Sequence, residues 1–330
     1  MPSTGPEGPG GAALQVAVGV IRDGYGRVLI ARRPETAHQG GLWEFPGGKI
    51  AAGESVDAAL ARELEEELGI RPLETRPLLR IPFSYPGRRV CLDTREVVRF
   101  AGDPVGREGQ PLRWVAPEAL PGYAFPAANA PIVNALRLPD RYLITPPLGD
   151  GAPEACLATL RARLADGVRL VQLRLPGTDP GQRAAIAREA AALCRAADAA
   201  LLVNGDPALA GRLGVGVHLR ASQLQTHTER PCGPDGWFGA SCHDAAELAR
   251  AAALGADFAV LGPVHPTTTH PDAVPMGMDG FAGRVADCPL PVYALGGLGL
   301  ADLAAVRAAG GQGVAAIRGL WDAAGPVASR

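Results

Sequence analysis

The sequence predicts an α/β fold in two domains, a mixed α/β sandwich followed by a (β/α)8 TIM barrel. The chain has 330 residues, which is long for a single hydrophobic core and favours two domains. In the first half, strand-like runs surround one long helical segment at 55–68. In the second half, short apolar runs alternate with Ala-rich helical segments, as in a barrel of parallel strands. We therefore expect a disordered tail at 1–12, a first domain at 13–138 and a second domain at 139–330.

The composition is that of a soluble globular protein. The chain is 47% hydrophobic and 20% charged, and its net charge of −2 provides no electrostatic basis for binding nucleic acid or an anionic membrane. No apolar run is long enough to predict a membrane span. The six cysteines lack C-x-x-C spacing, so neither a zinc site nor a redox motif is predicted, and a reducing, cytoplasmic location fits best. Residues 1–11 have neither the basic start nor the apolar run of a signal peptide. The oligomeric state stays open.

The strands of the first domain are expected where Val, Ile and other apolar residues run or alternate between Gly and Pro breaks. A turn at Asp23-Gly24 and Gly26 predicts that the first two strands form a hairpin. The expected strands are 15–21, 27–31, 78–84, 90–100 and 112–115, and a short helix is expected near 130–138.

The helical segment at 55–68 is rich in Ala, Leu and Glu, which favour helix, and Gly69 marks its end. Leu60, Leu64 and Leu68 recur every fourth residue. They form one apolar stripe that should face the core of the first domain.

The other face of this helix carries carboxylates at positions i, i+3 and i+4, which are Glu63, Glu66 and Glu67. Like charges at this spacing oppose the helix by roughly 0.2–0.5 kcal/mol per pair, so a compensating cation is expected. Mg²⁺ is the natural candidate, with Mn²⁺ as the alternative, because Mg²⁺ prefers carboxylate, water and phosphate oxygens. Arg62 could fix one carboxylate by a bidentate pair, and Gly47 and Gly48 leave room for metal and phosphates. A solvated acidic helix face is the ordinary alternative.

The spacing of this stretch matches a family signature. After Gly48 come Glu54, Arg62-Glu63-Leu64, Glu66-Glu67 and Gly69-Ile70. At every defining position the stretch resembles the signature of the Nudix hydrolases, which cleave a nucleoside diphosphate linked to another group. The strings VGVIRD, ARRPETAH, WEFPGGKI, REGQPLRW and FPAANAPIV also resemble the MutT-like branch, the 8-oxo-dGTP diphosphatases, over about residues 15–138. The resemblance implies a Nudix α/β/α sandwich and a role in nucleotide-pool sanitation.

The resemblance also implies roles for the matching residues. Metal binding falls on Gly47, Glu63, Glu66, Glu67 and Glu108, and catalysis on Glu63, Glu108 and Arg62. Substrate binding falls on Arg33, His38, Glu44, Phe45, Pro46, Gly47, Arg88 and Asn129. Asn129 would hold the purine, since an amide offers a base edge both a donor and an acceptor. The ordinary alternatives are surface charges for Arg33 and Arg88, a loop residue for His38 and a helix cap for Asn129.

The implied reaction is Mg²⁺-dependent hydrolysis of a nucleoside triphosphate, such as 8-oxo-dGTP, to the monophosphate and pyrophosphate. An activated water would attack the β-phosphorus in line. Glu63 or Glu108 would take its proton. The sequence leaves the choice between these two carboxylates open.

The second domain contains eight short apolar runs, at 142–145, 168–173, 200–203, 216–219, 237–240, 258–261, 291–295 and 313–317. In a TIM barrel the functional groups sit at the C-terminal ends of the strands. Gly296-Gly297 follows the seventh run, where a phosphate site is expected.

The ends of these runs resemble thiamine-phosphate synthase and its tautomerase-like relatives. The strings that carry the resemblance are RYLIT, VQLRL, LLVNGDPALA, GVHL, GASCHD, GADFAVLGPVHPTTTH and PVYALGGL. The resemblance implies a candidate barrel ligand site, for a thiamine precursor with its pyrimidine or phosphate. The matching positions are Gln172, Arg174, Asn204, Ser241, Thr267, Thr269 and Gly297.

Several positions depart from the synthase pattern. The lysines expected after Arg174 and Thr269 are replaced by Pro176 and His270, and the acid expected after Asn204 is Gly205. A second acid is missing from the segment 220–223. Without metal carboxylates and phosphate lysines the transition state would lose its main charge stabilisation, so we predict that the barrel does not synthesise thiamine phosphate. Asp206 is the one nearby acid that could substitute.

Three hypotheses for the whole chain follow. The first is an 8-oxo-dGTP diphosphatase fused to a degenerate barrel. The second is a hydrolase of a thiamine-pathway pyrimidine diphosphate, delivered or sensed by the barrel. The third is a Nudix enzyme regulated by a barrel that senses a thiamine precursor. Asn129 favours a purine substrate, whereas Gln172 and Asn204 indicate a pyrimidine-like ligand in the barrel.

Overall fold

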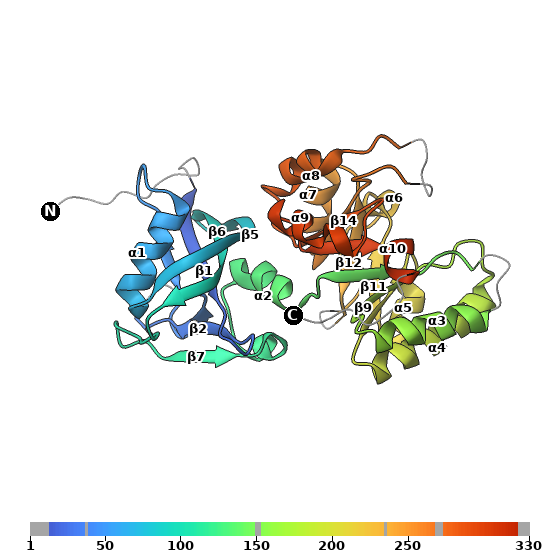
Figure 1. The fold of residues 1–330 in the computed structure, drawn as a ribbon, viewed down its shortest axis with the longest axis horizontal. Coiled ribbons are helices and arrows are strands. Elements are labelled where there is room, and N and C mark those ends of the chain that lie inside the picture. The colour runs from blue at the N-terminus through green and yellow to red at the C-terminus, as the bar shows by residue number, and fades with distance from the viewer. Residues whose placement is uncertain (1–12, 37–38, 149–152, 234–235, 268–272, 323–330) are drawn as a thin grey trace. The chain divides into compact units, whose positions relative to one another are not determined.

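The computed structural model describes residues 13–36, 39–148, 153–233, 236–267 and 273–322. The tail at 1–12 and the site candidates His38 and Thr269 lie outside the described residues. The chain divides into two units, Met1–Arg137 and Leu138–Arg330 (Figure 1). Each unit is described separately.

Unit 1 contains two sheets and the long helix α1, with shorter helices after the last strand. One sheet is mixed, because β1 runs parallel to β6 and antiparallel to β4. In the order of pairing, its strands are β4 (Gly47–Lys49), β1 (Leu14–Ile21), β6 (Arg88–Ala101) and β5 (Arg71–Tyr85). The other sheet is formed by β3 (Trp43–Glu44), β2 (Val28–Arg32) and β7 (Leu112–Val115). The predicted mixed α/β fold of the first half is confirmed.

The predicted turn between the first two strands is confirmed, but the strands do not pair into a hairpin. Strands β1 and β2 lie in different sheets, and the turn between them is closed by an isolated antiparallel bridge between Arg22 and Val28 and by a hydrogen bond from the N–H of Asp23 to the carbonyl of Arg27 at 3.0 Å. Residues 18–21 of β1 and 28–31 of β2 are buried without the alternation of a half-exposed strand. Each strand is therefore central in its own sheet, with a neighbouring strand on both sides. Two strands paired only with each other in a hairpin would each keep one unpaired edge.

Strand β5 begins at Arg71, well before the expected start at residue 78. Pro72, Pro77 and Pro82 lie within it. Proline is tolerated there because β5 is an edge strand, paired only with β6, and its register shifts near Pro72 and Pro77. Because of these prolines the strand was predicted to be too short, but they do not interrupt β5 in the structure.

Helix α1 (Val56–Leu68) is defined by local signals at both ends. The Oγ of Ser55 accepts a hydrogen bond from the N–H of Ala58 at 3.2 Å, and Gly69 ends the helix with φ of +71°. The predicted apolar stripe is confirmed, since Leu60, Leu64 and Leu68 are fully buried. The shorter helices of unit 1 are η1 (Pro117–Gly122), η2 (Ala127–Asn129) and α2 (Ala130–Arg137).

Unit 2 is a closed barrel of eight parallel strands, which confirms the predicted (β/α)8 architecture. In order around the barrel, the strands are β8 (Arg141–Ile144), β9 (Leu170–Leu173), β10 (Ala200–Asn204), β11 (Gly216–Leu219), β12 (Phe238–Cys242), β13 (Phe258–Leu261), β14 (Val292–Leu295) and β15 (Gly313–Ala316). Each strand matches one of the predicted apolar runs to within a few residues.

The helices of unit 2 pack outside the strands, and their apolar faces share one core with the outward strand residues. These helices are α3 (Pro153–Ala165), α4 (Pro180–Ala196), α5 (Pro207–Leu213), α6 (Ala221–Leu224), α7 (Ala245–Ala253), α8 (Gly277–Val285), η3 (Leu300–Asp302), α9 (Leu303–Ala308) and α10 (Arg318–Trp321). A second cluster fills the barrel interior, where the rings of Tyr142 and Phe258 make a T-shaped contact at 5.2 Å. The barrel is thus a packed core whose free groups lie at its ends.

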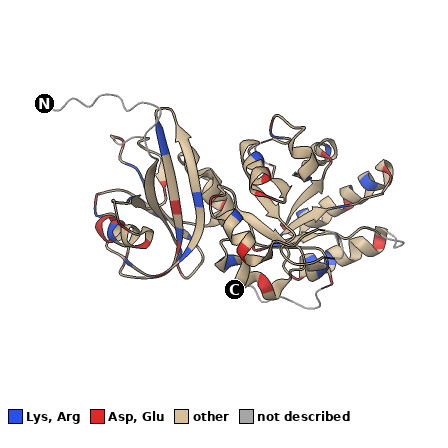
Figure 2. Cartoon of the chain, turned by 90° about the horizontal axis from the view of Figure 1, so that it is seen from above, with Lys and Arg blue, Asp and Glu red and all other residues tan. Residues whose placement is uncertain are grey.

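Acidic and basic residues are interspersed over both units (Figure 2). In the described part of the chain, no helix is long and apolar enough to cross a membrane. All six cysteines are free thiols.

Candidate active site

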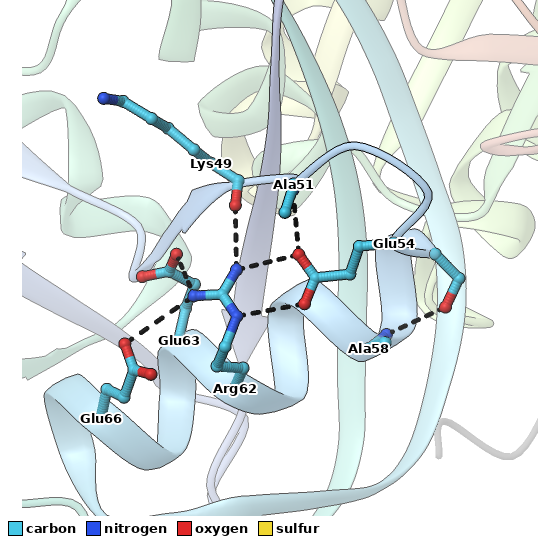
Figure 3. A network of polar contacts seen from close by, with 8 residues as sticks. Lys49, Ala51, Glu54, Ala58, Arg62, Glu63 and Glu66 are labelled. Atoms are coloured by element: carbon cyan, nitrogen blue, oxygen red, sulfur yellow. Dashed lines mark hydrogen bonds and ion pairs between the residues drawn. The ribbon is translucent and has the colours of Figure 1, made fainter.

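Arg62 is the centre of a polar network on α1 (Figure 3). Its guanidinium donates two hydrogen bonds to the carboxylate of Glu54, at 3.1 and 3.0 Å, and one to the carbonyl of Lys49 at 3.0 Å. Its Nη1 donates to Glu63 Oε1 at 2.7 Å and lies 3.7 Å from Glu66. The hydrogen bonds to Glu54 and then Glu63 raise the pKa of Arg62 above its usual value. Arg62 therefore orients Glu63 and ties the loop before α1 to the helix.

The glycine pair in β4 lies against the acidic face of α1. A β-carbon at Gly48 would come within 2.2 Å of the Glu63 carboxylate carbon. Gly47 has φ of +145°, and its N–H donates to Glu67 Oε2 at 3.4 Å. Gly48 therefore allows the Glu63 carboxylate to approach the backbone directly, whereas a β-carbon at Gly47 would come within 2.1 Å of the carbonyl oxygen of Ala17.

Four carboxylates, two from α1, one from β3 and one from a loop, influence one another here. Burial first, and then the nearby charges of Glu44, Glu108 and Glu63, together raise the pKa of Glu67 to about 8, although the hydrogen bond from Gly47 lowers it. Burial also raises the pKa of Glu44, although its ion pair with Arg33 opposes the shift. Glu108, on an exposed loop, raises both pKa values, which places its charge close to this cluster. The cluster is a concentration of negative charge that a cation would relieve.

In the described residues, no three His, Cys, Asp or Glu side chains converge on one point from which a metal could be held. Glu63 is bound to Arg62, and Glu66 is largely exposed. The oxygen donors and the raised pKa of Glu67 nevertheless suit a hard cation such as Mg²⁺. The expectation of Mg²⁺ or Mn²⁺ here stays a prediction.

A pocket of about 230 Å³ opens beside the glycine pair. It brings together the predicted residues Arg33, Glu44, Phe45, Gly47, Arg88 and Asn129. Phe45 stacks on Phe125 with ring centroids 5.3 Å apart, and Asn129 is only 6% exposed. Pro46 is not in the described lining, and its carbonyl accepts from the N–H of Gly19 at 2.8 Å.

A second, larger cavity of about 870 Å³ lies at the carboxyl ends of the barrel strands. Its lining includes every predicted barrel residue that the structure describes: Gln172, Arg174, Asn204, Ser241, Thr267 and Gly297.

A buried chain of hydrogen bonds runs beneath this cavity. Asn204 Nδ2 donates to Gln172 Oε1 at 2.9 Å, and Gln172 Nε2 donates to the hydroxyl of Tyr142 at 3.2 Å. His218 bonds Tyr142 through Nδ1 at 3.1 Å and Ser241 through Nε2 at 2.9 Å. Burial lowers the pKa of His218 to about 3, so its imidazole is neutral. The network holds the amides of Gln172 and Asn204 at the cavity floor.

Comparisons with known proteins support the resemblance of each half of the chain to its family. The NUDIX domain family matches residues 17–135, and the family described as thiamine monophosphate synthase matches residues 141–320. The 8-oxo-dGTP diphosphatase of Escherichia coli is 40% identical over 124 residues, 38% of this chain and 96% of that protein. The chain belongs to the Nudix and thiamine monophosphate synthase families.

Two further relatives extend this assignment. The Nudix domain is similar to the 8-oxo-dGTP diphosphatase of Haemophilus influenzae, which is 42% identical over 123 residues, 37% of this chain and 90% of that protein. The synthase-like barrel is similar to the thiamine-phosphate synthase of Chromobacterium violaceum, which is 39% identical over 191 residues, 57% of this chain and 90% of that protein. These homologues confirm both recognised families and the predicted enzyme class, a Nudix pyrophosphohydrolase.

Sequence reasoning missed several residues of the Nudix domain. Glu54 was recognised as a signature position but received no role, and it is the bidentate partner of Arg62. Tyr85 lines the pocket, and its hydroxyl accepts from the N–H of Ala128 at 3.3 Å. The apolar floor comes from alternate residues of β1 and β6, which are Leu14, Val16, Val18, Val90 and Leu92. Their period of two was visible in the sequence, but the pairing of the two strands was not.

The synthase-like barrel also has lining residues that were not predicted, including Arg220, His243 and Arg318. Asp206, the acid that could have replaced the missing carboxylates, instead caps α5 by accepting from the N–H of Leu209 at 2.9 Å. It also lies 3.7 Å from Arg183, and it is not part of the described cavity lining.

Proposed function

We propose that the Nudix domain hydrolyses 8-oxo-dGTP to 8-oxo-dGMP and pyrophosphate with Mg²⁺, and so cleanses the nucleotide pool. The observation that carries this proposal is the pocket that Asn129 and Arg33 share with Gly47, whose N–H donates to Glu67. A base held by Asn129 would leave its phosphates directed toward the glycine pair and the carboxylate cluster. The two diphosphatase relatives support the choice of substrate.

Different side chains of the pocket would bind different parts of the substrate. The buried amide of Asn129 offers a donor and an acceptor to a purine edge, and the Phe45 and Phe125 pair gives the pocket a rigid apolar side. Arg33, oriented by Glu44, and Arg88 supply positive charge at the pocket. Binding would thus orient the triphosphate before reaction.

The carboxylates would carry the chemistry. Gly47, Glu63, Glu66, Glu67 and Glu108 would hold Mg²⁺, which when bound supplies charge neutralisation and acidifies water. Arg62 keeps Glu63 in place through its hydrogen bond of 2.7 Å. Glu63 or Glu108 accepts the proton from the attacking water.

The first test is hydrolysis by the full-length protein with Mg²⁺ of 8-oxo-dGTP, dGTP and an aminopyrimidine diphosphate, with the released phosphate species identified. Preference for 8-oxo-dGTP with release of pyrophosphate supports the proposal. Preference for the pyrimidine diphosphate would instead support the second hypothesis, in which both halves act on one pathway. An EDTA control should abolish hydrolysis.

A matched pair of variants tests the site. Glu66→Gln removes a proposed metal ligand, whereas Glu65→Gln changes its neighbour, which pairs with Arg107 at 3.1 Å. We expect Glu66→Gln to abolish hydrolysis and Glu65→Gln to leave it within about twofold, with both variants folded, since surface changes away from a site have little effect. Full, metal-dependent activity in Glu66→Gln would refute the site assignment.

For the synthase-like barrel we propose no thiamine-phosphate synthesis. The support is that the described cavity lining has no carboxylate, while Asp206 is occupied as a helix cap. Incubating the full-length protein with aminopyrimidine diphosphate, thiazole phosphate and Mg²⁺ should give no thiamine phosphate. Formation of the product would overturn this proposal. Calorimetric titration with the same compounds tests the sensing hypothesis, which absence of heat would contradict.

A further inference from the structure

The described lining of the barrel cavity carries positive charge and no negative charge. Its described lining contains the arginines Arg174, Arg220 and Arg318, together with His243, and no Asp or Glu. Positive groups in a concave site strengthen one another's attraction for an anion. This lining therefore favours a ligand with several negative charges and disfavours a divalent cation.

The guanidinium of Arg220 lies where a side chain at Gly205 would extend, and Gly205 is the position at which the synthase pattern has an acid. A β-carbon at Gly205 would lie 2.5 Å from Arg220 Nε and 2.6 Å from its Nη2. The carbonyl of Gly205 accepts from Gln223 Nε2 at 3.1 Å, and the Oε1 of Gln223 accepts from the N–H of Arg220 at 3.1 Å. The guanidinium thus lies at the junction of β10 and β11, with its backbone held there. The residues present do not fit Mg²⁺, because a guanidinium already lies at this position and the described cavity lining has no carboxylate.

Arg174 provides a second guanidinium at the adjacent strand end. Its backbone is clamped by Thr145, whose Oγ1 accepts from the Arg174 N–H at 2.9 Å and donates to the Arg174 carbonyl at 3.1 Å. Its Nη1 is buried and has no hydrogen-bond partner among the described residues. A buried charged donor without an acceptor is unfavourable. An anion bound in the cavity would supply the missing acceptor.

We propose that Arg220 replaces a divalent cation in this barrel, so that the cavity binds a diphosphate group on Arg174 and Arg220 without metal. The two arginines directly follow β9 and β11, the strands that flank β10. Arginine suits this task because its charge does not depend on pH and its planar fork matches phosphate oxygens. This inference concerns the barrel alone and does not depend on the proposed activity of the Nudix domain.

The test uses inorganic pyrophosphate and the full-length protein, with binding measured by titration calorimetry in EDTA and again in Mg²⁺. We expect binding in EDTA, weakened at least about tenfold in Arg220→Gln and in Arg174→Gln, as loss of a charge-assisted contact predicts. Gly205→Asp should weaken binding in the same way, because its carboxylate would pair with Arg220. Far-ultraviolet circular dichroism checks that each variant is folded.

Two control variants locate the binding site. Arg212→Gln changes an exposed arginine on α5 and should leave the affinity unchanged. Arg33→Gln changes the Nudix pocket and should also leave binding in EDTA unchanged. Binding that requires Mg²⁺, that survives Arg220→Gln at full strength, or that disappears in Arg33→Gln would each overturn the proposal.

Discussion

The carboxylate of Glu63 packs against the backbone of Gly48 so closely that a β-carbon there would come within 2.2 Å of its Cδ. Gly48 and Glu63 lie on different elements, β4 and α1, and their approach is possible because Gly48 has no side chain. The same carboxylate is held from the other side by Arg62 at 2.7 Å. Its position is therefore fixed by a backbone and by a guanidinium together.

Gly48→Ala should displace Glu63 and lower kcat for nucleotide hydrolysis about 100-fold, because a misplacement near 1 Å can cost that much. Gly24→Ala is the matched control, since a β-carbon at Gly24 would meet open space. The measurement is steady-state hydrolysis at saturating Mg²⁺. Equal kcat values for the two variants would show that the position of Glu63 is not critical.

Arg62→Lys should keep the positive charge but lose the two-pronged bond to Glu54, because lysine has no planar fork. We expect kcat to fall about tenfold or more, as for other losses of positioning, with an unchanged thermal unfolding temperature. Arg76→Lys is the control, since Arg76 makes a single exposed ion pair with Glu74 at 3.4 Å. Wild-type kcat in Arg62→Lys would mean that the bidentate geometry is dispensable.

Leu64→Ala should destabilise the Nudix domain by about 2–5 kcal/mol, the usual cost of a cavity at a fully buried leucine. Leu73→Ala should change stability by less than about 0.5 kcal/mol, because Leu73 is 47% exposed. Hydrogen exchange of peptides from β1 and β6, followed across a urea series, reports on this domain specifically. A small effect at Leu64 would contradict its assignment to the core.

His218 should make the barrel sensitive to acid. Burial lowers its pKa to about 3 from an ordinary value of 6.5, so the fold favours the neutral imidazole. The contribution of the neutral imidazole to the free energy of unfolding is complete above about pH 6.5. It is lost as the pH falls toward 3, at up to about 1.4 kcal/mol per pH unit. Hydrogen exchange of barrel-strand peptides in urea at pH 7 and pH 5 measures the loss.

His218→Gln should reduce the difference in barrel stability between pH 7 and pH 5, whatever its effect at pH 7 alone. The exposed His243 provides the control, and His243→Gln should retain the wild-type difference. If all three proteins lose the same stability between these pH values, His218 is not the group responsible.

Much of the architecture could be predicted because its signals are local. The Ser55 cap, the leucine stripe and Gly69 all lie within one stretch of sequence and determine α1 by themselves. The barrel strands were likewise recognisable, since each is a short run of buried residues between helical segments. The partner of β1 was not predicted, because pairing with β6 depends on residues more than 70 positions away, as at Val16 and Leu92.

The residues of the candidate sites likewise include some that local sequence predicted and some that it did not. Residue types at signature spacing made Glu63, Glu66 and Glu67 candidate metal ligands, and the strings around Arg33 and Asn129 contain residues that the structure brings to one pocket. Nothing in local spacing indicated that Glu54 would be the main partner of Arg62. Side-chain partners were missed where the two residues lie in separate segments that come together only in the folded chain.

The sequence by itself determined the two domains, the helix with its acidic face and the order of the barrel strands, because periodicity and end signals are read within a few turns of chain. Only the tertiary structure decided that β1 and β2 enter separate sheets and that Glu63 fills the space over Gly48. It also decided that Arg220 lies against Gly205. These contacts depend on the close approach of segments from separate elements, and such steric and electrostatic complementarity exists only once the chain is packed.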